Sequence, residues 1–351
     1  MRILFAGSPG IAVPALQALF SFADKNADFE VAGVLTNPDS PKGRSGIPQP
    51  TEVGAAAQKA FAAQKIYAEN VAHNGAGEAP ILKPEKLDAG LREQVAVLKP
   101  DLLVSFAYGR IFGPKFLALF PLGGINVHPS LLPKYRGPTP IPAAILARDT
   151  ETGITIQRLA LEMDSGGILM QERVTLNGRE TTASLSELMS HKAAQLLLTA
   201  IADIADGTVH ATPQDNEKTS YCSLISKEDG RIDWGKSALE IDAQIRAFDP
   251  WPQCWTYHGD KQLFILKANV GMVQKEFSTT ELCCSKDPGL TDSVITPEPG
   301  LVLGTDKQQG ILVQTGDGIL AVTELQYQGK KALGWRDFLN GARNFIGQKL
   351  R

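Results

Sequence analysis

Three residue types that suit carbonyl chemistry occur close together in this chain. Asn126 and His128 stand two residues apart, and Asp164 follows shortly before two glycines. On a strand, residues i and i+2 face the same way, so the amide and the imidazole should share one site. Pro129 and Pro133 cannot donate to a ladder, so the strand should end after His128. An oxyanion donor, an acid/base and a carboxylate make Asn126, His128 and Asp164 our predicted catalytic residues.

Each of these residues also has an ordinary structural explanation. Asparagine often occupies turns, and a single histidine is more often structural than catalytic. The loop Ser130–Pro133 can be a turn with two core leucines, or the wall of a pocket for a flat heterocycle. We favour the functional interpretation because the polar residues and the proline-bounded loop occur together.

The elements around this site alternate between strand and helix patterns. Such alternation predicts an α/β domain with a parallel-rich, Rossmann-like sheet, whose ligands bind at the carboxyl ends of the strands. His128 falls at such an end, and so do Tyr108 and Gly109. The expected strands are Arg2–Ala6, Glu30–Thr36, Asp101–Ala107, Ile125–His128, Thr155–Leu159 and Leu169–Leu176, and the expected helices lie near Thr51–Ala63, Glu85–Leu98 and Thr182–Asp206.

The second part of the chain has a different character. Gly207–Thr219 is polar and weakly periodic, so we predict a catalytic domain over 1–206, a linker over 207–225 and a second domain over 226–351. Short apolar runs separated by turn signals predict a small OB-like β-barrel there. Its expected strands are Phe264–Val270, Leu301–Gly304, Gly310–Val313 and Ile319–Leu325, flanked by helices near Ser237–Phe248 and Trp335–Ile346. Ala72–Pro80 reads as a surface insertion.

Composition narrows the class of protein. The 351 residues, 43% hydrophobic and 21% charged, suit two globular domains. The net charge of -3 neither announces nor excludes a nucleic-acid partner. The four cysteines show no C-x-x-C spacing, so we expect no metal site and a reduced, cytoplasmic protein. The first apolar run is too short for a signal peptide, and no segment is long enough to cross a membrane.

Weaker signals concern phosphate groups. The turn Gly7–Gly10 lacks G-x-G-x-x-G spacing, and Pro9 removes a backbone donor, which disfavours a nicotinamide-dependent dehydrogenase. This turn could still line a substrate pocket. Lys42, Arg44 and Arg136 could be solvated or could reach the phosphates of a nucleic acid.

The sequence resembles the 10-formyltetrahydrofolate-dependent formyltransferases. The resemblance rests on Asn126-x-His128-x-Ser130-Leu131-Leu132-Pro133, on Arg136-Gly137 and on Asp164-Ser165-Gly166. Arg231-Ile232-Asp233-Trp234 and Asp249-Pro250-Trp251-Pro252 resemble the C-terminal domain of the members that act on methionyl-tRNA, which the single-domain purine-pathway members lack. The supporting segments span nearly the whole chain.

The resemblance implies formyl transfer from 10-formyltetrahydrofolate, as co-substrate, to the α-amino group of methionine on initiator methionyl-tRNA. It places the catalytic roles on Asn126, His128 and Asp164. We expect a monomer, and we expect no metal because side chains can handle the charges of the reaction. We expect a protonated His128 and the Asn126 amide to bind the oxyanion, while Asp164 supports the imidazole and accepts the amine proton through water. The expected folate-binding residues are Ser130, Leu131, Leu132, Pro133, Tyr108 and Gly109, and the expected tRNA contacts are Lys42, Arg44 and Arg136.

The chain departs from the family pattern in ways that leave alternatives open. Pro129 often is glycine in the family, Tyr135 often is tryptophan, and the loop around Lys42–Pro48 is usually more basic. Asp164 is followed by Ser165-Gly166-Gly167 where the family commonly has Asp-x-Gly-Asp. The acceptor could instead be an amino-sugar or a purine precursor, or the protein could be a non-catalytic RNA- or folate-binding module.

Overall fold

The computed structural model divides into two compact units. It describes all residues except 42–45, 64–79, 272–296 and 343, so Lys42, Arg44 and nearly all of the predicted insertion 72–80 lie outside the described residues. The first unit comprises residues 1–144, 150–176 and 184–224, and the second comprises 145–149, 177–183 and 225–351. Among the described residues, no helix combines the length and the apolar character needed to cross a membrane.

A seven-stranded sheet forms the centre of the first unit. The five strands on one side of the sheet pair in parallel, and β8 and β9 add antiparallel pairs at the other side. The predicted parallel-rich α/β sheet is thus confirmed. The strands, in spatial order, are β5 (Ile81–Leu82), β2 (Glu30–Leu35), β1 (Arg2–Gly7), β6 (Leu102–Phe106), β7 (Gly124–His128), β8 (Glu151–Arg158) and β9 (Ile168–Thr175).

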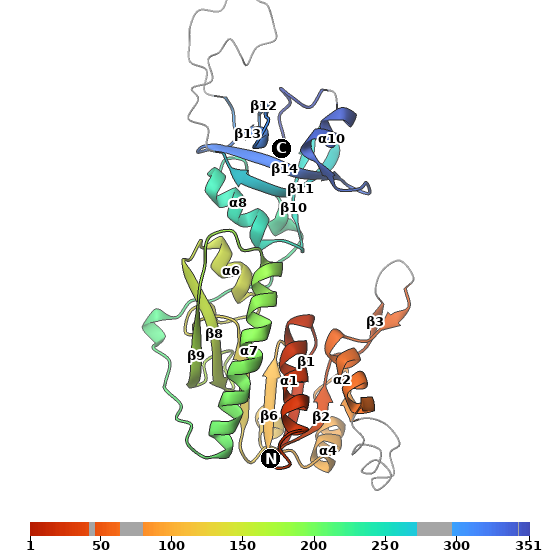
Figure 1. Cartoon of the computed structure of the whole chain (residues 1–351), viewed down its shortest axis with the longest axis vertical. Coiled ribbons are helices and arrows are strands. Elements are labelled where there is room, and N and C mark those ends of the chain that lie inside the picture. The colour runs from red at the N-terminus through yellow and green to blue at the C-terminus, as the bar shows by residue number, and fades with distance from the viewer. Residues whose placement is uncertain (42–45, 64–79, 272–296, 343) are drawn as a thin grey trace, which may run out of the picture. The chain divides into compact units, whose positions relative to one another are not determined.

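Helices cover this sheet because its central strands are apolar on both faces. All five residues of β6 are buried, as expected for a strand with helices on either side. Figure 1 shows α1 and α7 lying alongside the strands. The first unit's helices are η1 (Gly10–Ala12), α1 (Val13–Ala23), α2 (Glu52–Ala63), α4 (Ala89–Val97), α5 (Pro114–Leu117), α6 (Pro140–Leu146), α7 (Thr182–Ala205) and η2 (Asn216–Lys218), and β3 (Ser40–Pro41) pairs with β4 (Pro48–Gln49).

The segment that we predicted as a linker packs on the first unit. Thr212 and Ile168 exchange two backbone hydrogen bonds of 2.8 Å, which adds a bridge to the edge of β9. Further along, the backbone N–H of Arg136 donates to the carbonyl of Ser220 and the N–H of Cys222 donates to the carbonyl of Arg136, around a bridge to Tyr221. Residues 207–224 therefore belong to the first unit and are not a free linker.

An antiparallel sheet forms the second unit, in the order β10-β11-β14-β13-β12 with β15 beside β14. A capping box, in which Ser237 and Glu240 satisfy each other's backbone N–H groups, begins α8. The elements are η3 (Glu228–Gly230), α8 (Ala238–Ala247), β10 (Cys254–His258), β11 (Lys261–Val270), β12 (Val302–Asp306), β13 (Gly310–Gln314), β14 (Ile319–Tyr327), β15 (Leu333–Gly334) and α10 (Trp335–Gly341).

The last residues of the chain close this sheet into a barrel. Arg351 exchanges backbone hydrogen bonds with Tyr257 of β10, while the N–H of Val302 in β12 donates to Gln348 at 2.9 Å. Leu350 is 2% exposed and inserts its side chain into the core. The C-terminal segment thus pairs with both edge strands of the sheet, and backbone groups there find partners within the same chain.

We expect Leu350→Ala to lower the free energy of unfolding of the second unit by about 2–4 kcal/mol, the usual cost of truncating a buried leucine. Urea denaturation followed by circular dichroism measures this. Ile346→Ala, at a side chain 44% exposed, is the matched control and should cost less than about 1 kcal/mol. Equal midpoints for the two variants would show that the C-terminal segment does not hold the barrel closed.

Candidate active site

Strand β7 presents Asn126 and His128 to the same face of the sheet. In the register of β7 with β8, Asn126 lies opposite Gln157 and His128 lies opposite Thr155. The strand ends at His128, as the following proline predicts. His128 is 4% exposed, whereas Asn126 is half-buried. The sheet therefore brings four polar side chains together near the end of β7.

Asp164 reaches this cluster from the loop between β8 and β9. Its backbone adopts a left-handed conformation, with φ at +51°, which aspartate tolerates better than most residues. Its carboxylate accepts hydrogen bonds from the amide of Gln157 at 2.8 Å, the backbone N–H of Gly137 at 2.9 Å and the amide of Asn126 at 3.3 Å. Three donors thus fix one carboxylate beside His128.

Glycine is required two residues further along this loop. A Cβ atom at Gly166 would lie 1.8 Å from the carbonyl oxygen of Arg158, so only glycine fits the turn. Gly166 is therefore needed for the close approach that returns the chain to β9. This steric requirement explains the glycine after the predicted catalytic aspartate.

The hydrogen-bond partners of His128 define its protonation. Its Nε2 lies 2.8 Å from the carbonyl oxygen of Tyr135, which can only accept, so Nε2 carries the hydrogen. Its Nδ1 lies 3.6 Å from a carboxylate oxygen of Asp164. Burial lowers the pKa of His128 below its usual range, and this outweighs the opposite effects of Asp164 and the Tyr135 carbonyl. The free site thus favours a neutral imidazole, whereas our sequence-based hypothesis started from a protonated one.

Thr155 and Gln171 fix the shape of the loop after β7. The hydroxyl of Thr155 donates to the carbonyl of Ser130 at 2.7 Å and accepts from the N–H of Leu132 at 3.1 Å. The amide of Gln171 donates to the carbonyl of Leu132 at 2.9 Å and to the Thr155 hydroxyl at 2.9 Å. The rigid loop that the prolines predict is held mainly by these two strand residues.

The predicted folate-binding residues fall into two groups. Ser130 and Leu132 are buried, and the Ser130 hydroxyl donates to the carbonyl of Lys134 at 2.6 Å. The ring of Tyr108 is 1% exposed and stacks on Phe112 in the core, so its side chain does not line the edge of the sheet. The residues with accessible surface are Leu131, Pro133 and Gly109.

Arg136 lies inside the protein and not on its surface. It is 4% exposed, and its guanidinium donates to Gln214 through Nε at 3.0 Å and Nη2 at 2.7 Å. Nη2 also donates to Asn216 at 3.1 Å. This geometry favours a structural role for Arg136 over the expected tRNA contact, because a buried, engaged guanidinium is not presented to a phosphate.

Three polar residues of this site are not among those predicted from the sequence: Thr155, Gln157 and Gln214. A signal for the first two was present, since Thr155 and Gln157 alternate with buried isoleucines along β8 and so must face one side together. Gln214 had no such signal, because it lies in the aperiodic segment that reads as a linker. Its amide donates to the backbone carbonyl of Asp164 at 2.7 Å.

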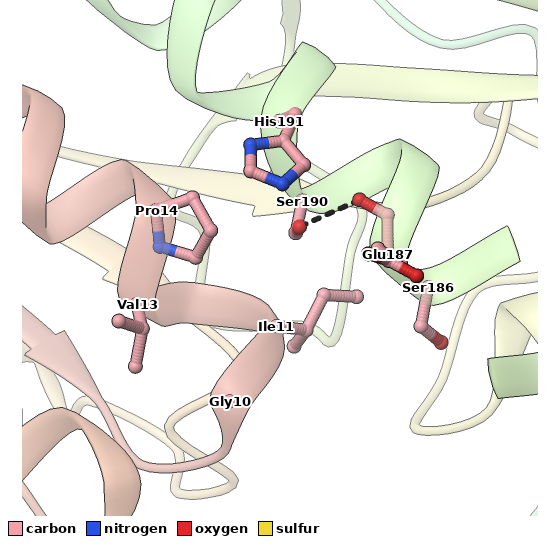
Figure 2. A pocket seen from close by; sticks show the side chains of 8 residues that line it. All are labelled: Gly10, Ile11, Val13, Pro14, Ser186, Glu187, Ser190 and His191. Carbon is pink, nitrogen blue, oxygen red and sulfur yellow. Dashed lines mark hydrogen bonds between the residues drawn. The ribbon is translucent and has the colours of Figure 1, made fainter. Parts of the chain in front are cut away.

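A separate cavity of about 370 Å³ opens between the start of α1 and the first half of α7 (Figure 2). The turn Gly7–Gly10, expected as a possible pocket wall, reaches it through its last glycine. The lining residues are Gly10, Ile11, Val13, Pro14, Ser186, Glu187, Ser190 and His191. None of the predicted catalytic residues lines this cavity. Within the described ranges, histidine, cysteine and acidic side chains nowhere gather in groups of three that could hold a metal ion.

Two family descriptions match the chain. Residues 1–201 match the family described as "Formyl transferase", and residues 224–343 match "Formyl transferase, C-terminal domain". A methionyl-tRNA formyltransferase of Treponema denticola is 47% identical over 346 residues, covering 99% of this chain and 98% of the relative. One of Borrelia hermsii is 38% identical over 348 residues, covering 99% of both chains.

Solved structures of low identity share the fold. WlaRD, a sugar 3N-formyl transferase determined with dTDP and 5-N-formyl-THF, aligns with a TM-score of 0.57 at 22% identity over 94% of this chain and 99% of its own. HypX of Aquifex aeolicus in complex with tetrahydrofolic acid aligns with a TM-score of 0.57 at 16% identity over 99% of this chain and 48% of its own.

We expect His128 to titrate below 6.5, with Nε2 protonated at neutral pH, because burial disfavours its charged form. NMR of the labelled imidazole measures both properties. Between the folded and unfolded pKa values the unfolded chain binds a proton that the folded chain lacks, so acidification through this window should lower stability. His128→Gln should remove that part of the pH dependence. A titration above 6.5 would contradict the neutral imidazole.

Proposed function

The chain belongs to the formyl transferase family, and we propose that it transfers the formyl group of 10-formyltetrahydrofolate to the α-amino group of initiator methionyl-tRNA. The family uses folate. The observation that carries the proposal is the convergence of Asn126 and His128 on the Asp164 carboxylate at the end of β7. The choice of acceptor is supported by two relatives that are named methionyl-tRNA formyltransferases. The chain is similar to them over nearly their whole length.

Formyl transfer from one nitrogen to another sets three requirements. The attacking amine must be neutral, the carbonyl must pass through a tetrahedral oxyanion, and the leaving nitrogen must gain a proton. The new C–N bond forms as the amine attacks, and the bond from carbon to the folate nitrogen then breaks. One group that first accepts and then returns a proton could serve both nitrogens.

We assign this proton transfer to His128. Its Nδ1 faces Asp164 with a free electron pair, because Nε2 carries the hydrogen that the Tyr135 carbonyl accepts. The imidazole can thus take the proton from the amine and return it to the leaving nitrogen. Asp164, 3.6 Å from Nδ1, stabilises the imidazolium that forms in between. The amide of Asn126 has two N–H groups, so one can hold Asp164 while the other donates to the oxyanion.

The formyl donor is assigned to the edge of the sheet after β6 and β7. Leu131, Pro133 and Gly109 have accessible surface there, while Ser130 and Leu132 shape the loop from within.

No metal enters this scheme, because side chains supply the oxyanion donor and the acid/base. The same chain supplies all three catalytic residues, and the substrate is a charged tRNA. We therefore propose a monomer that acts in the cytoplasm, and light scattering after size exclusion tests its mass against 37.7 kDa.

The proposed acceptor is tested by offering 10-formyltetrahydrofolate with one of three amines: initiator methionyl-tRNA, methionine amide or a dTDP-amino-sugar. Release of tetrahydrofolate is followed by absorbance, and the formylated product by mass spectrometry. Transfer to methionyl-tRNA alone supports the proposal. Preference for the amino-sugar would replace the acceptor, and folate binding without transfer to any of the amines would indicate a non-catalytic protein.

We expect Asn126→Ala, His128→Ala and Asp164→Asn each to lower kcat by about 10²-fold or more, since each removes a group that acts on the same transition state. The losses should not add in double variants. Circular dichroism should be unchanged, and His191→Ala, at an exposed histidine of α7, is the matched control. A His128 variant with near-normal kcat would refute the assigned proton transfer.

We retain Lys42 and Arg44 as proposed tRNA contacts on the basis of the sequence alone. Replacing both with alanine should weaken tRNA binding and flatten its dependence on salt, because fewer counterions are released. Folate affinity should not change. The control is Lys25→Ala with Lys59→Ala, which removes the same charge from two exposed helical or turn positions. An unchanged salt slope in titrations of tRNA would show that this loop does not contact RNA.

A further inference from the structure

We propose that Gln214 is a positioning residue for Asp164, and that the buried Arg136 holds Gln214 in the orientation that this role requires. The inference rests on the proposed function, since it concerns the aspartate assigned to formyl transfer. It gives the segment 207–224 a part in the active site, although that segment reads as a linker in the sequence.

Gln214, which lies outside the strands of the sheet, binds the turn that contains Asp164. Its Nε2 group donates to the backbone carbonyls of Asp164 at 2.7 Å and Gly166 at 2.8 Å. The same group lies 3.3 Å from the side-chain oxygen of Gln157, whose amide donates to the Asp164 carboxylate. Gln214 therefore restrains both the backbone of Asp164 and one of the donors to its carboxylate.

Arg136 fixes which way the Gln214 amide faces. Its Nε and Nη2 groups both donate to Oε1 of Gln214, at 3.0 and 2.7 Å. A guanidinium can only donate, so the amide oxygen must face Arg136 and the amide nitrogen must face the turn. With Arg136 only 4% exposed, water competes little for these bonds.

The backbone on either side of Arg136 contacts both His128 and Asp164. The carbonyl of Tyr135 accepts from His128, and the N–H of Gly137 donates to Asp164. The guanidinium between these two residues extends to Gln214 and so to the turn of Asp164. A closed set of hydrogen bonds thus sets the separation of Nδ1 and carboxylate at 3.6 Å.

A left-handed aspartate needs such restraint to hold one position. The conformation at Asp164 is intrinsically disfavoured, and its loop is exposed on the side of Leu161 and Met163. Without the bonds from Gln214, the turn could relax toward a commoner backbone conformation. The carboxylate would then move relative to His128, and small displacements of a reacting group reduce rates strongly.

The test compares Gln214→Ala and Gln214→Glu with the wild-type protein. The first removes both ends of the amide. The second keeps the size and an oxygen toward Arg136 but places a second oxygen against the two turn carbonyls. We expect both to lower kcat by about 10- to 100-fold, with KM for folate and for methionyl-tRNA changed by no more than about threefold.

Asp215→Ala is the matched control. It lies next to Gln214, begins η2 by accepting from the N–H of Glu217 and pairs with Lys218 at the surface, and it is not among the described partners of the Asp164 carboxylate. Its kcat should stay within about twofold of wild type, and melting temperatures report the stability of all three variants. Gln214 variants that melt earlier but keep kcat per folded molecule would overturn the positioning role. An equal loss in Asp215→Ala would do the same, and absence of transfer by the wild type would overturn the proposed function as well.

Discussion

The site depends on how one carboxylate is held. Asp164 lies in a short turn with a disfavoured backbone conformation, and its position is set from outside the turn. Donors from β7, from β8 and from the loop after β7 converge on its side chain, and Gln214 binds its main chain. The strands hold their donor groups in fixed positions, so the position of the carboxylate is well defined although Asp164 belongs to a loop.

Burial favours a neutral His128 beside the Asp164 carboxylate. Removing the imidazole from water favours its neutral form, while the Tyr135 carbonyl keeps the hydrogen on Nε2. The electron pair on Nδ1 is then directed toward Asp164, where a proton arriving from an amine would be stabilised. A neutral imidazole beside a carboxylate becomes an imidazolium–carboxylate ion pair when it accepts a proton, which fits a transfer in which one proton leaves one nitrogen and joins another.

The sequence predicted the parts of the molecule that follow from local pattern. Alternating strands and helices predicted the parallel-rich sheet, and the i, i+2 spacing of Asn126 and His128 predicted their common face, as β7 shows. Short apolar runs predicted the second sheet, but its closure by residues 348–351 depends on pairing with distant strands. The burial of Tyr108 could not be predicted from the sequence, because the packing of its ring on Phe112 depends on tertiary structure.

The largest difference between sequence and structure concerns segments without periodicity. Polar residues at 207–224 look like a linker because they bury no apolar face, yet Gln214 and Ser220 use their hydrogen-bonding groups to complete the site. Arg136 likewise looks like a surface cation until its amide partners are known. Hydrophobic patterns in the sequence indicate which segments form the core. The place of a polar segment depends on its hydrogen-bond partners, which only the structure shows. In this chain Gln214 and Arg136, which hold the turn of Asp164, are therefore residues whose place no periodic pattern shows.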